Sequence, residues 1–322
     1  MIAITDSTQK ISQLLIEALL EKGFVLNVFK SNQLENLSAK IINHQNINWI
    51  EGSILDITSL EQLLEGAEIV YHLAELKTFD RKQRNQMYKI NVEGTANVVN
   101  VAIDFNVTKI VFRSSYLALG DKPNNGIYDE ETKWNEIADA NGYGWSKHLA
   151  EREIWRCVNE GVNGVILNVG QILGDSLQQS EFLELYHYFG KKQSVTNANF
   201  PFIDELDLLK ILIQSKESNI ENSNVLVYHK AITYQYFMHV LGVLKNDDKQ
   251  SNFLSLSHLR RRANIVRWIP FYKSNKAMLN YNLLNEITSE KQYSNQKLKS
   301  LFDIEFTNEQ LTYSKIAKIV KA

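Results

Sequence analysis

The sequence predicts an α/β fold, in which a doubly wound parallel sheet carries a smaller, mostly C-terminal α/β lobe. Short apolar runs alternate with helix-length segments over about six units before residue 175, and such alternation is typical of right-handed crossovers between parallel strands. Beyond residue 175 this rhythm gives way to mixed helices and loops. We therefore expect residues 1–174 to form the main domain and residues 175–322 mostly the smaller lobe, with some segments returning to the main domain.

The first half of the main domain is predicted as follows. IAIT at 2–5 is a strand, and the amphipathic run SQLLIEALLEKG is a helix that Gly23 ends. VLNVF at 25–29 and NINWIEG at 46–52 are the next strands. SLEQLLEG is a helix that leads to the strand AEIVYHLA at 67–74.

The second half repeats the pattern with longer helices. A helical stretch from about Arg81 to Asn106 leads to the strand KIVFRSS at 109–115, and a second one from about Tyr143 to Glu160 leads to GVILNVG at 164–170. In open sheets of this kind, ligands bind at the carboxyl ends of the strands. We therefore expect a small-molecule substrate at that edge.

The totals restrict the class of protein further. The chain has 322 residues and a net charge of −2, which gives no reason to expect a nucleic-acid partner. A single cysteine excludes an internal disulfide, and no apolar run approaches the roughly 20 residues that span a bilayer. With a strand predicted from Ile2, these observations predict a soluble cytoplasmic protein without a transmembrane segment. The oligomeric state is not readable, and a homodimer is one open alternative.

The strongest chemical signal is Tyr143-Gly-Trp-Ser-Lys147 at the start of a predicted helix. Residues four apart lie one above the other on a helix. An ammonium beside a phenol favours the phenolate and lowers a pKa that is otherwise about 10. The pair therefore predicts a proton donor and acceptor that works near neutral pH.

Two serines, Ser114 and Ser115, close the strand KIVFRSS. A hydroxyl there would point into the crevice at the carboxyl edge, where Ser115 could hydrogen-bond a substrate carbonyl while Tyr143 delivers the proton. The alternative is that both serines satisfy backbone groups at the end of the strand.

These residues stand in a longer pattern that resembles the extended short-chain dehydrogenase/reductases, also called the NAD-dependent epimerase/dehydratase family. Within that family the chain is most similar to bacterial proteins related to dihydroflavonol 4-reductase. The resemblance rests on the stretches VYHLAE at 70–75, INVEGTANVV at 90–99, VFRSSYLALG at 111–120, YGWSK at 143–147, AEREIWR at 150–156, VILNVGQILG at 165–174 and YSNQKLKSLFDIEFT at 293–307.

The resemblance implies a Rossmann dinucleotide-binding domain, a variable substrate lobe, and NAD or NADP as cofactor. It assigns Ser115, Tyr143 and Lys147 to the catalytic serine, tyrosine and lysine. It also places Ala74 and Asn91 near the cofactor.

The stretch TDSTQKIS at 5–12 aligns without a gap on the family's TGxxGxxG, but Asp6, Gln9 and Ser12 replace the three glycines. Ser12 is small enough for a helix to pack closely on its strand. Asp6 brings a carboxylate to the place where the pyrophosphate is expected, and two charges about 4 Å apart repel by up to roughly 4 kcal/mol. Gln9 fills space that the cofactor's contact with the backbone needs.

Three more positions bear on the cofactor. Ser53 stands where relatives usually carry an aspartate that binds the adenine amino group, and Glu75 replaces a small residue that lines the cofactor cleft. Lys30, after the second strand, either meets a 2′-phosphate, which would favour NADP, or is a plain surface lysine.

Two hypotheses follow. In the first, the chain is an NAD(P)-dependent oxidoreductase or epimerase that acts on a carbonyl or hydroxyl of a small molecule, with Tyr143 as acid/base, Lys147 holding the ribose and Ser115 polarising the carbonyl. In the second, it is a pseudoenzyme of the same fold that binds dinucleotide weakly or not at all and serves as a binding or scaffold protein.

Overall fold

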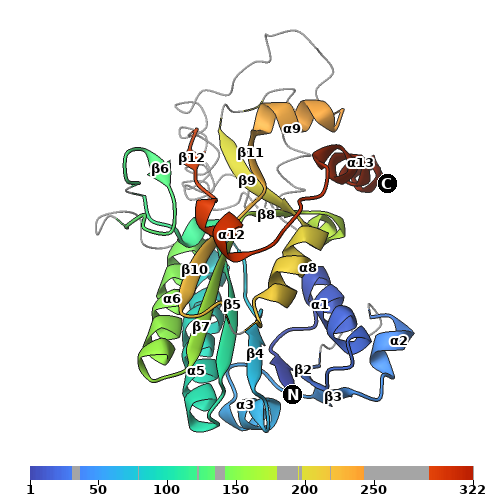
Figure 1. The fold of residues 1–322 in the computed structure, drawn as a ribbon, viewed down its shortest axis with the longest axis vertical. Coiled ribbons are helices and arrows are strands. Elements are labelled where there is room, and N and C mark those ends of the chain that lie inside the picture. Colours follow the sequence, from blue (N-terminus) through green and yellow to red (C-terminus); the bar gives the residue numbers. More distant parts are fainter. Residues whose placement is uncertain are drawn as a thin grey trace.

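A computed structural model describes residues 1–30, 37–78, 80–121, 123–134, 142–179, 195, 198–217, 219–242 and 290–321. Its main sheet has seven strands in the order β10-β7-β5-β4-β1-β2-β3, and all neighbours are parallel (Figure 1). The strands are β1 (Ile2–Ile4), β2 (Leu26–Phe29), β3 (Ile47–Ile50), β4 (Ile69–His72), β5 (Lys109–Ser115), β7 (Asn163–Val169) and β10 (Ser223–Val227). The predicted doubly wound parallel sheet is confirmed.

Two layers of helices cover the sheet. One face carries α1 (Lys10–Glu21), α8 (Glu205–Gln214) and α12 (Gln296–Leu301), and the other carries α3 (Ile57–Leu64), α5 (Gly94–Asp104) and α6 (Tyr143–Asn159). Alternation along β1 divides its side chains, because Ile2 and Ile4 pack in the first cluster and Ala3 in the second. The short helix α2 (Ala39–Ile42) adds Ile41 to the first cluster.

The stretch predicted as one helix from about residue 81 to 106 contains a wider turn. A 3-10 turn (Arg81–Gln83) and α4 (Arg84–Tyr88) come first, and a π-helical turn (Lys89–Glu93) then joins α4 to α5. Asn106 ends the stretch in the left-handed conformation with φ 54°, which asparagine tolerates better than most residues. The π-helical turn contains Asn91, and such turns occur often at functional sites.

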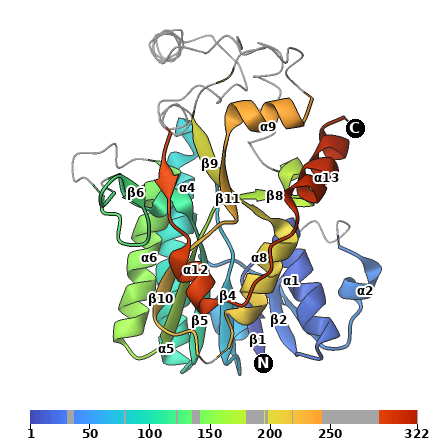
Figure 2. The same cartoon turned by 45° about the horizontal axis from the view of Figure 1, so that its top comes forward.

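The smaller lobe lies beyond the carboxyl ends of the main strands (Figure 2). It is built on a three-stranded sheet of β11 (Lys230–Thr233), β9 (Asn199–Asp204) and β8 (Gln171–Leu173), with α9 (Tyr234–Val240) and α13 (Glu309–Lys321) beside it. A separate pair joins β6 (Ile127–Tyr128) to β12 (Gln292–Tyr293). Segments on both sides of residue 175 therefore contribute to each part, since β8 joins the lobe while α8, β10 and α12 join the main layers.

Among the described residues, no helix is both long enough and apolar enough to span a membrane.

Candidate active site

Two of the three predicted catalytic residues, Ser115 and Tyr143, lie at one cavity beside the carboxyl end of β5, and Lys147 is not part of its lining. Ser115 ends β5, and Tyr143 begins α6, which packs beside that strand. Gly144 allows this approach, because a side-chain Cβ there would lie 2.1 Å from the carbonyl oxygen of Leu117, just after β5. Ser115 and Tyr143 both line a cavity of about 280 Å³. The structure therefore brings these two together, as the sequence predicts, and buries Lys147 behind them.

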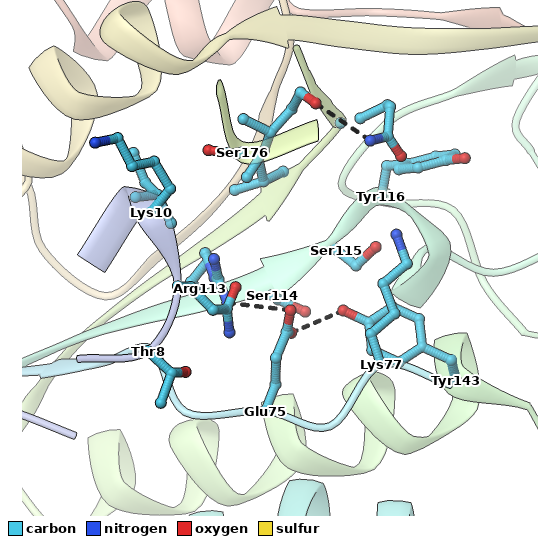
Figure 3. Close-up of a pocket in the computed structure, with 16 residues that line it drawn as sticks. Thr8, Lys10, Glu75, Lys77, Arg113, Ser114, Ser115, Tyr116, Tyr143 and Ser176 are labelled. Atoms are coloured by element: carbon cyan, nitrogen blue, oxygen red, sulfur yellow. Dashed lines mark hydrogen bonds and ion pairs between the residues drawn. The ribbon is translucent and has the colours of Figure 1, made fainter. Parts of the chain in front are cut away.

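Glu75 lies at the centre of this group, between Tyr143 and Arg113 (Figure 3). The Tyr143 hydroxyl donates to Glu75 Oε2 at 2.8 Å, and Lys147 Nζ lies 3.2 Å from the same oxygen. Arg113 Nη2 lies 3.1 Å from Glu75 Oε1. Lys147 Nζ also donates to the Arg113 carbonyl oxygen at 2.7 Å and lies 4.3 Å from the centre of the Phe112 ring. One carboxylate thus engages both the tyrosine and the lysine.

The electrostatics of Tyr143 oppose the role predicted from its spacing. Burial, and then the Glu75 carboxylate, raise the pKa of Tyr143 well above its usual value. Burial lowers the pKa of Lys147, and Glu75 opposes that effect. Burial alone would raise the pKa of Glu75, but Arg113 and Lys147 outweigh it and lower this pKa to about 2. In this arrangement Glu75 is ionised, and Tyr143 keeps its proton at neutral pH.

Arg113 is the site residue that sequence reasoning missed. Its side chain leaves the middle of the sheet, donates through Nη2 to the Leu73 carbonyl oxygen at 3.0 Å, and is only 4% exposed. A signal was present, because an arginine that directly follows the apolar run IVF at 110–112 of a predicted strand needs a buried partner. Glu75, after the neighbouring strand β4, is that partner.

The turn after β1 holds its own anion. The Asp6 carboxylate accepts the backbone N–H groups of Thr8 at 3.1 Å and Gln9 at 3.2 Å, together with the Thr8 hydroxyl at 2.5 Å and the Ser12 hydroxyl at 2.6 Å. These donors stand at the N-terminus of α1, where a phosphate would otherwise find free N–H groups. An internal carboxylate therefore takes the contacts that a pyrophosphate requires.

Gln9 closes the space beside that turn. Its Oε1 accepts from Arg113 Nη2 at 2.7 Å, so a hydrogen bond runs from the start of α1 to β5 across the end of β4. Together with Asp6 and Glu75, this bond fills the positions that glycines and small side chains leave open in the family motif. The residues of the turn, in this arrangement, do not fit a dinucleotide.

The other predicted cofactor residues make internal contacts. Asn91 binds the segment after β4, since its Oδ1 accepts the Leu76 N–H at 2.8 Å and its Nδ2 donates to the Leu76 carbonyl oxygen at 3.1 Å and to Ser146 Oγ at 2.9 Å. The Ala74 N–H donates to Thr5 Oγ1 at 3.0 Å.

Lys30 and Ser53 lie at the ends of β2 and β3, outside the cavity lining. Lys30 Nζ pairs with Glu51 at 2.8 Å, and the Ser53 hydroxyl accepts the Leu55 N–H at 3.0 Å.

Ser114, in contrast to Ser115, satisfies a buried acid. Its hydroxyl donates to Glu151 Oε1, which also accepts from Asn168 Nδ2 at 2.6 Å. Burial raises the pKa of Glu151 to about 7, against the lowering effect of these two hydrogen bonds. The alternative of a serine that satisfies a backbone group describes Ser115, whose Oγ accepts the Leu117 N–H at 3.2 Å, whereas Ser114 binds a side-chain carboxylate.

A doubly wound parallel sheet with a serine, a tyrosine and a lysine at its carboxyl edge defines the short-chain dehydrogenase/reductase class. The chain belongs to the 3-beta hydroxysteroid dehydrogenase/isomerase family, whose model matches residues 7–177, more than half of its length. This match confirms the predicted membership in the NAD(P)-dependent reductase and epimerase families.

Curated relatives agree with this assignment. The chain is 27% identical over 225 residues to cinnamoyl-CoA reductase 1 of Petunia hybrida, covering 64% of this chain and 66% of the relative. It is 28% identical over 173 residues to a putative dihydroflavonol 4-reductase of Synechocystis, covering 53% of this chain and 49% of the relative. These matches span less than two thirds of each relative's length.

Solved structures share the whole fold. The structure of gox2253 superposes with a TM-score of 0.77 at 19% identity, covering 98% of this chain and 96% of that one. The Bordetella bronchiseptica enzyme WbmH, solved in complex with NAD+, gives a TM-score of 0.72 at 18% identity, covering 99% and 97%. The predicted Rossmann-type fold is thereby confirmed.

Proposed function

We propose that this chain is a small-molecule-binding protein built on the reductase and epimerase fold, and that it does not carry out hydride transfer. The observation that carries this proposal is the position of Glu75, whose carboxylate takes the Tyr143 hydroxyl at 2.8 Å and lies 3.2 Å from Lys147 Nζ. An acid/base tyrosine needs a lysine that lowers its pKa. Burial, and then the Glu75 carboxylate, raise the pKa of Tyr143 instead.

The contacts of the turn after β1 support the same proposal. Asp6 supplies the negative charge at the N-terminus of α1, and the Gln9–Arg113 hydrogen bond occupies the neighbouring space. A bound dinucleotide would have to displace both, and would also bring its phosphates close to the Asp6 carboxylate.

A second candidate function is that of an NAD(P)-dependent reductase or epimerase with Tyr143 as acid/base. It is favoured by the shared cavity of Ser115 and Tyr143 and by the family's own chemistry. It requires Glu75 and Gln9 to leave their present partners when the cofactor enters.

Fluorescence titration with NADH and with NADPH separates the two candidates. We expect no saturable binding by the native chain below about 1 mM. Lys30→Met is the matched control, because it removes a cation beside the expected adenosine end without touching the Glu75 group. If no dinucleotide binds, the titration curves of Lys30→Met and of the native chain should be the same. Micromolar binding, with turnover that Tyr143→Phe abolishes, would instead establish the second candidate.

A further inference from the structure

The cavity beside Glu75 is open to a ligand, although Asp6 and Gln9 fill the space in the turn after β1 where a dinucleotide would bind. It lies between the carboxyl edge of the main sheet and the start of the smaller lobe, because its lining runs from Thr8 to Gln171 and Ser176. Its volume of about 280 Å³ lies near the lower end of the range for ligand pockets. The cavity therefore suits a compound of small size.

The charges of the lining are unbalanced. Lys10, Lys77 and Arg113 are cationic, and Glu75 is the acid among the described residues that line the cavity. That acid is already matched, since Arg113 and Lys147 lie within 3.2 Å of its two oxygens. Positive charge thus remains at the wall, in a place where partial burial weakens screening by solvent.

Arg113 still has donors to offer. Its Nη2 group donates to Gln9 Oε1 and to the Leu73 carbonyl oxygen and forms an ion pair with Glu75. In the part of the chain that the structure describes, the side-chain hydrogen bonds of Arg113 all run through Nη2, and its Nε and Nη1 groups make none. A guanidinium held in this way presents a fork of N–H groups that matches a carboxylate or a phosphate.

Lys77 supplies a second cation on the other side of Glu75 (Figure 3). Its Nζ lies 5.7 Å from the centre of the Tyr143 ring. No carboxylate of the described residues lies within ion-pair distance of it. Lys77 and Arg113 therefore stand on either side of one carboxylate whose charge is already satisfied.

We propose that this cavity binds a small organic anion through a carboxylate or phosphate group held by Arg113 and Lys77. The proposal rests on the function proposed above and names the class of ligand for the same site. The group comes from a free small molecule and not from a dinucleotide, because Asp6 and the Gln9–Arg113 bond occupy the path that the pyrophosphate would take.

Isothermal titration at constant ionic strength tests the proposal, with inorganic phosphate and malonate as the two probes and sodium chloride as the blank. We expect saturable binding of at least one probe in the millimolar range and about tenfold weaker binding by Lys77→Met. Binding of phosphate alone or of malonate alone would support the site and would identify the group that it prefers.

Lys77→Met is preferred to an Arg113 variant because it leaves the Glu75–Arg113 pair intact, and unpairing a buried charge endangers folding. Lys22→Met is the matched control, since Lys22 is exposed at the far end of α1, roughly 18 Å along the helix from Lys10. Lys22→Met should bind phosphate and malonate as tightly as the native chain does.

No saturable binding of either probe up to about 20 mM, or equal binding by Lys77→Met and the native chain, would overturn the anion site. Micromolar NADH binding would overturn the proposed function instead. The two failures are therefore distinguishable.

Discussion

At the scale of single residues, the site is a set of charges that depend on one another. Glu75 departs from the family pattern, and Arg113 is a charged residue in a buried strand. Each accounts for the other, because the two side chains lie 3.1 Å apart. Removing one member of such a buried pair costs about 3–5 kcal/mol, because the other charge stays buried without compensation. The two residues therefore form a coupled unit, and neither is understood alone.

Glu151 gives a prediction at this scale. Burial raises its pKa in the folded state to about 7, above an unfolded value near 4.5, so the folded state holds the proton more tightly. Its contribution to stability is fully present below about pH 4.5 and is lost as pH rises through 7. In Glu151→Gln this loss disappears, and the difference amounts to about 3 kcal/mol.

Urea unfolding of both proteins at a series of pH values between 4.5 and 8 measures this difference. The variant must be compared with the native chain at each pH, because Glu75 and His72 have the opposite effect. Their pKa values are lowered to about 2 and about 3, so their contributions to the free energy of unfolding decrease as the solution becomes acidic. Glu160→Gln, which removes an exposed carboxylate just after the same helix, is the control. A pH-independent difference for Glu151→Gln would show that Glu151 does not retain its proton.

At the scale of elements, the turn before α1 satisfies its own hydrogen-bond donors, which stabilises the protein and leaves fewer donors for a ligand. Asp6 lies before the helix and binds the N–H groups of Thr8 and Gln9. Its charge also suits the positive end of the helix. A glycine turn would leave those donors free for a phosphate, whereas this turn satisfies them without any ligand.

The double variant Asp6→Gly/Gln9→Gly tests this interpretation. We expect NADH to bind roughly thirty- to a thousandfold more tightly than to the native chain, because a like charge and an obstructing side chain are removed. The stability of the protein should fall by about 1–2 kcal/mol, because the turn before the helix loses its hydrogen bonds to the Asp6 carboxylate.

Titration and urea unfolding at one ionic strength measure both effects. Ser12→Gly is the matched control for binding, because the one hydrogen bond of the Ser12 hydroxyl within the described residues goes to the Asp6 carboxylate. Loss of stability without any gain in binding would move the obstruction to Glu75 and Ser53.

At the scale of the whole molecule, the main sheet is completed by residues from beyond position 175. β10 pairs with β7 at the edge of the sheet, and α8 packs on α1. The Tyr71 hydroxyl of β4 also donates to the Leu212 carbonyl oxygen at 2.9 Å. The later part of the chain is thus an integral part of the first core.

We therefore expect a fragment of residues 1–174 not to fold cooperatively. It lacks Leu208, Ile211 and Leu212 of α8, all fully buried, whose burial is worth about 5–9 kcal/mol together and so approaches the whole stability of a typical domain. Thermal unfolding followed by circular dichroism, next to the full chain, measures the outcome. A sharp, native-like transition of the fragment would contradict this prediction.

The residues that lie in regular patterns are those whose places could be predicted. Apolar periodicity located β1 to β5 and β7, and the spacing of Tyr143 and Lys147 placed both on one helix. The return of β10 to the sheet was not predictable from periodicity, because a short apolar run after residue 175 does not reveal which strand edge it will join.

The sequence by itself determined the layers of the fold, the loss of the motif glycines and the residue types at the carboxyl edge, since each depends on local pattern or on position along the chain. Only the tertiary structure decided what those residues do. Ser115 and Tyr143 share a cavity, but Tyr143 binds Glu75, which in turn binds Arg113 and Lys147. The physical reason is that burial and charge act across space: the pKa of Tyr143 depends on how deeply the fold buries it and on the carboxylate placed beside it, 68 residues away in the chain.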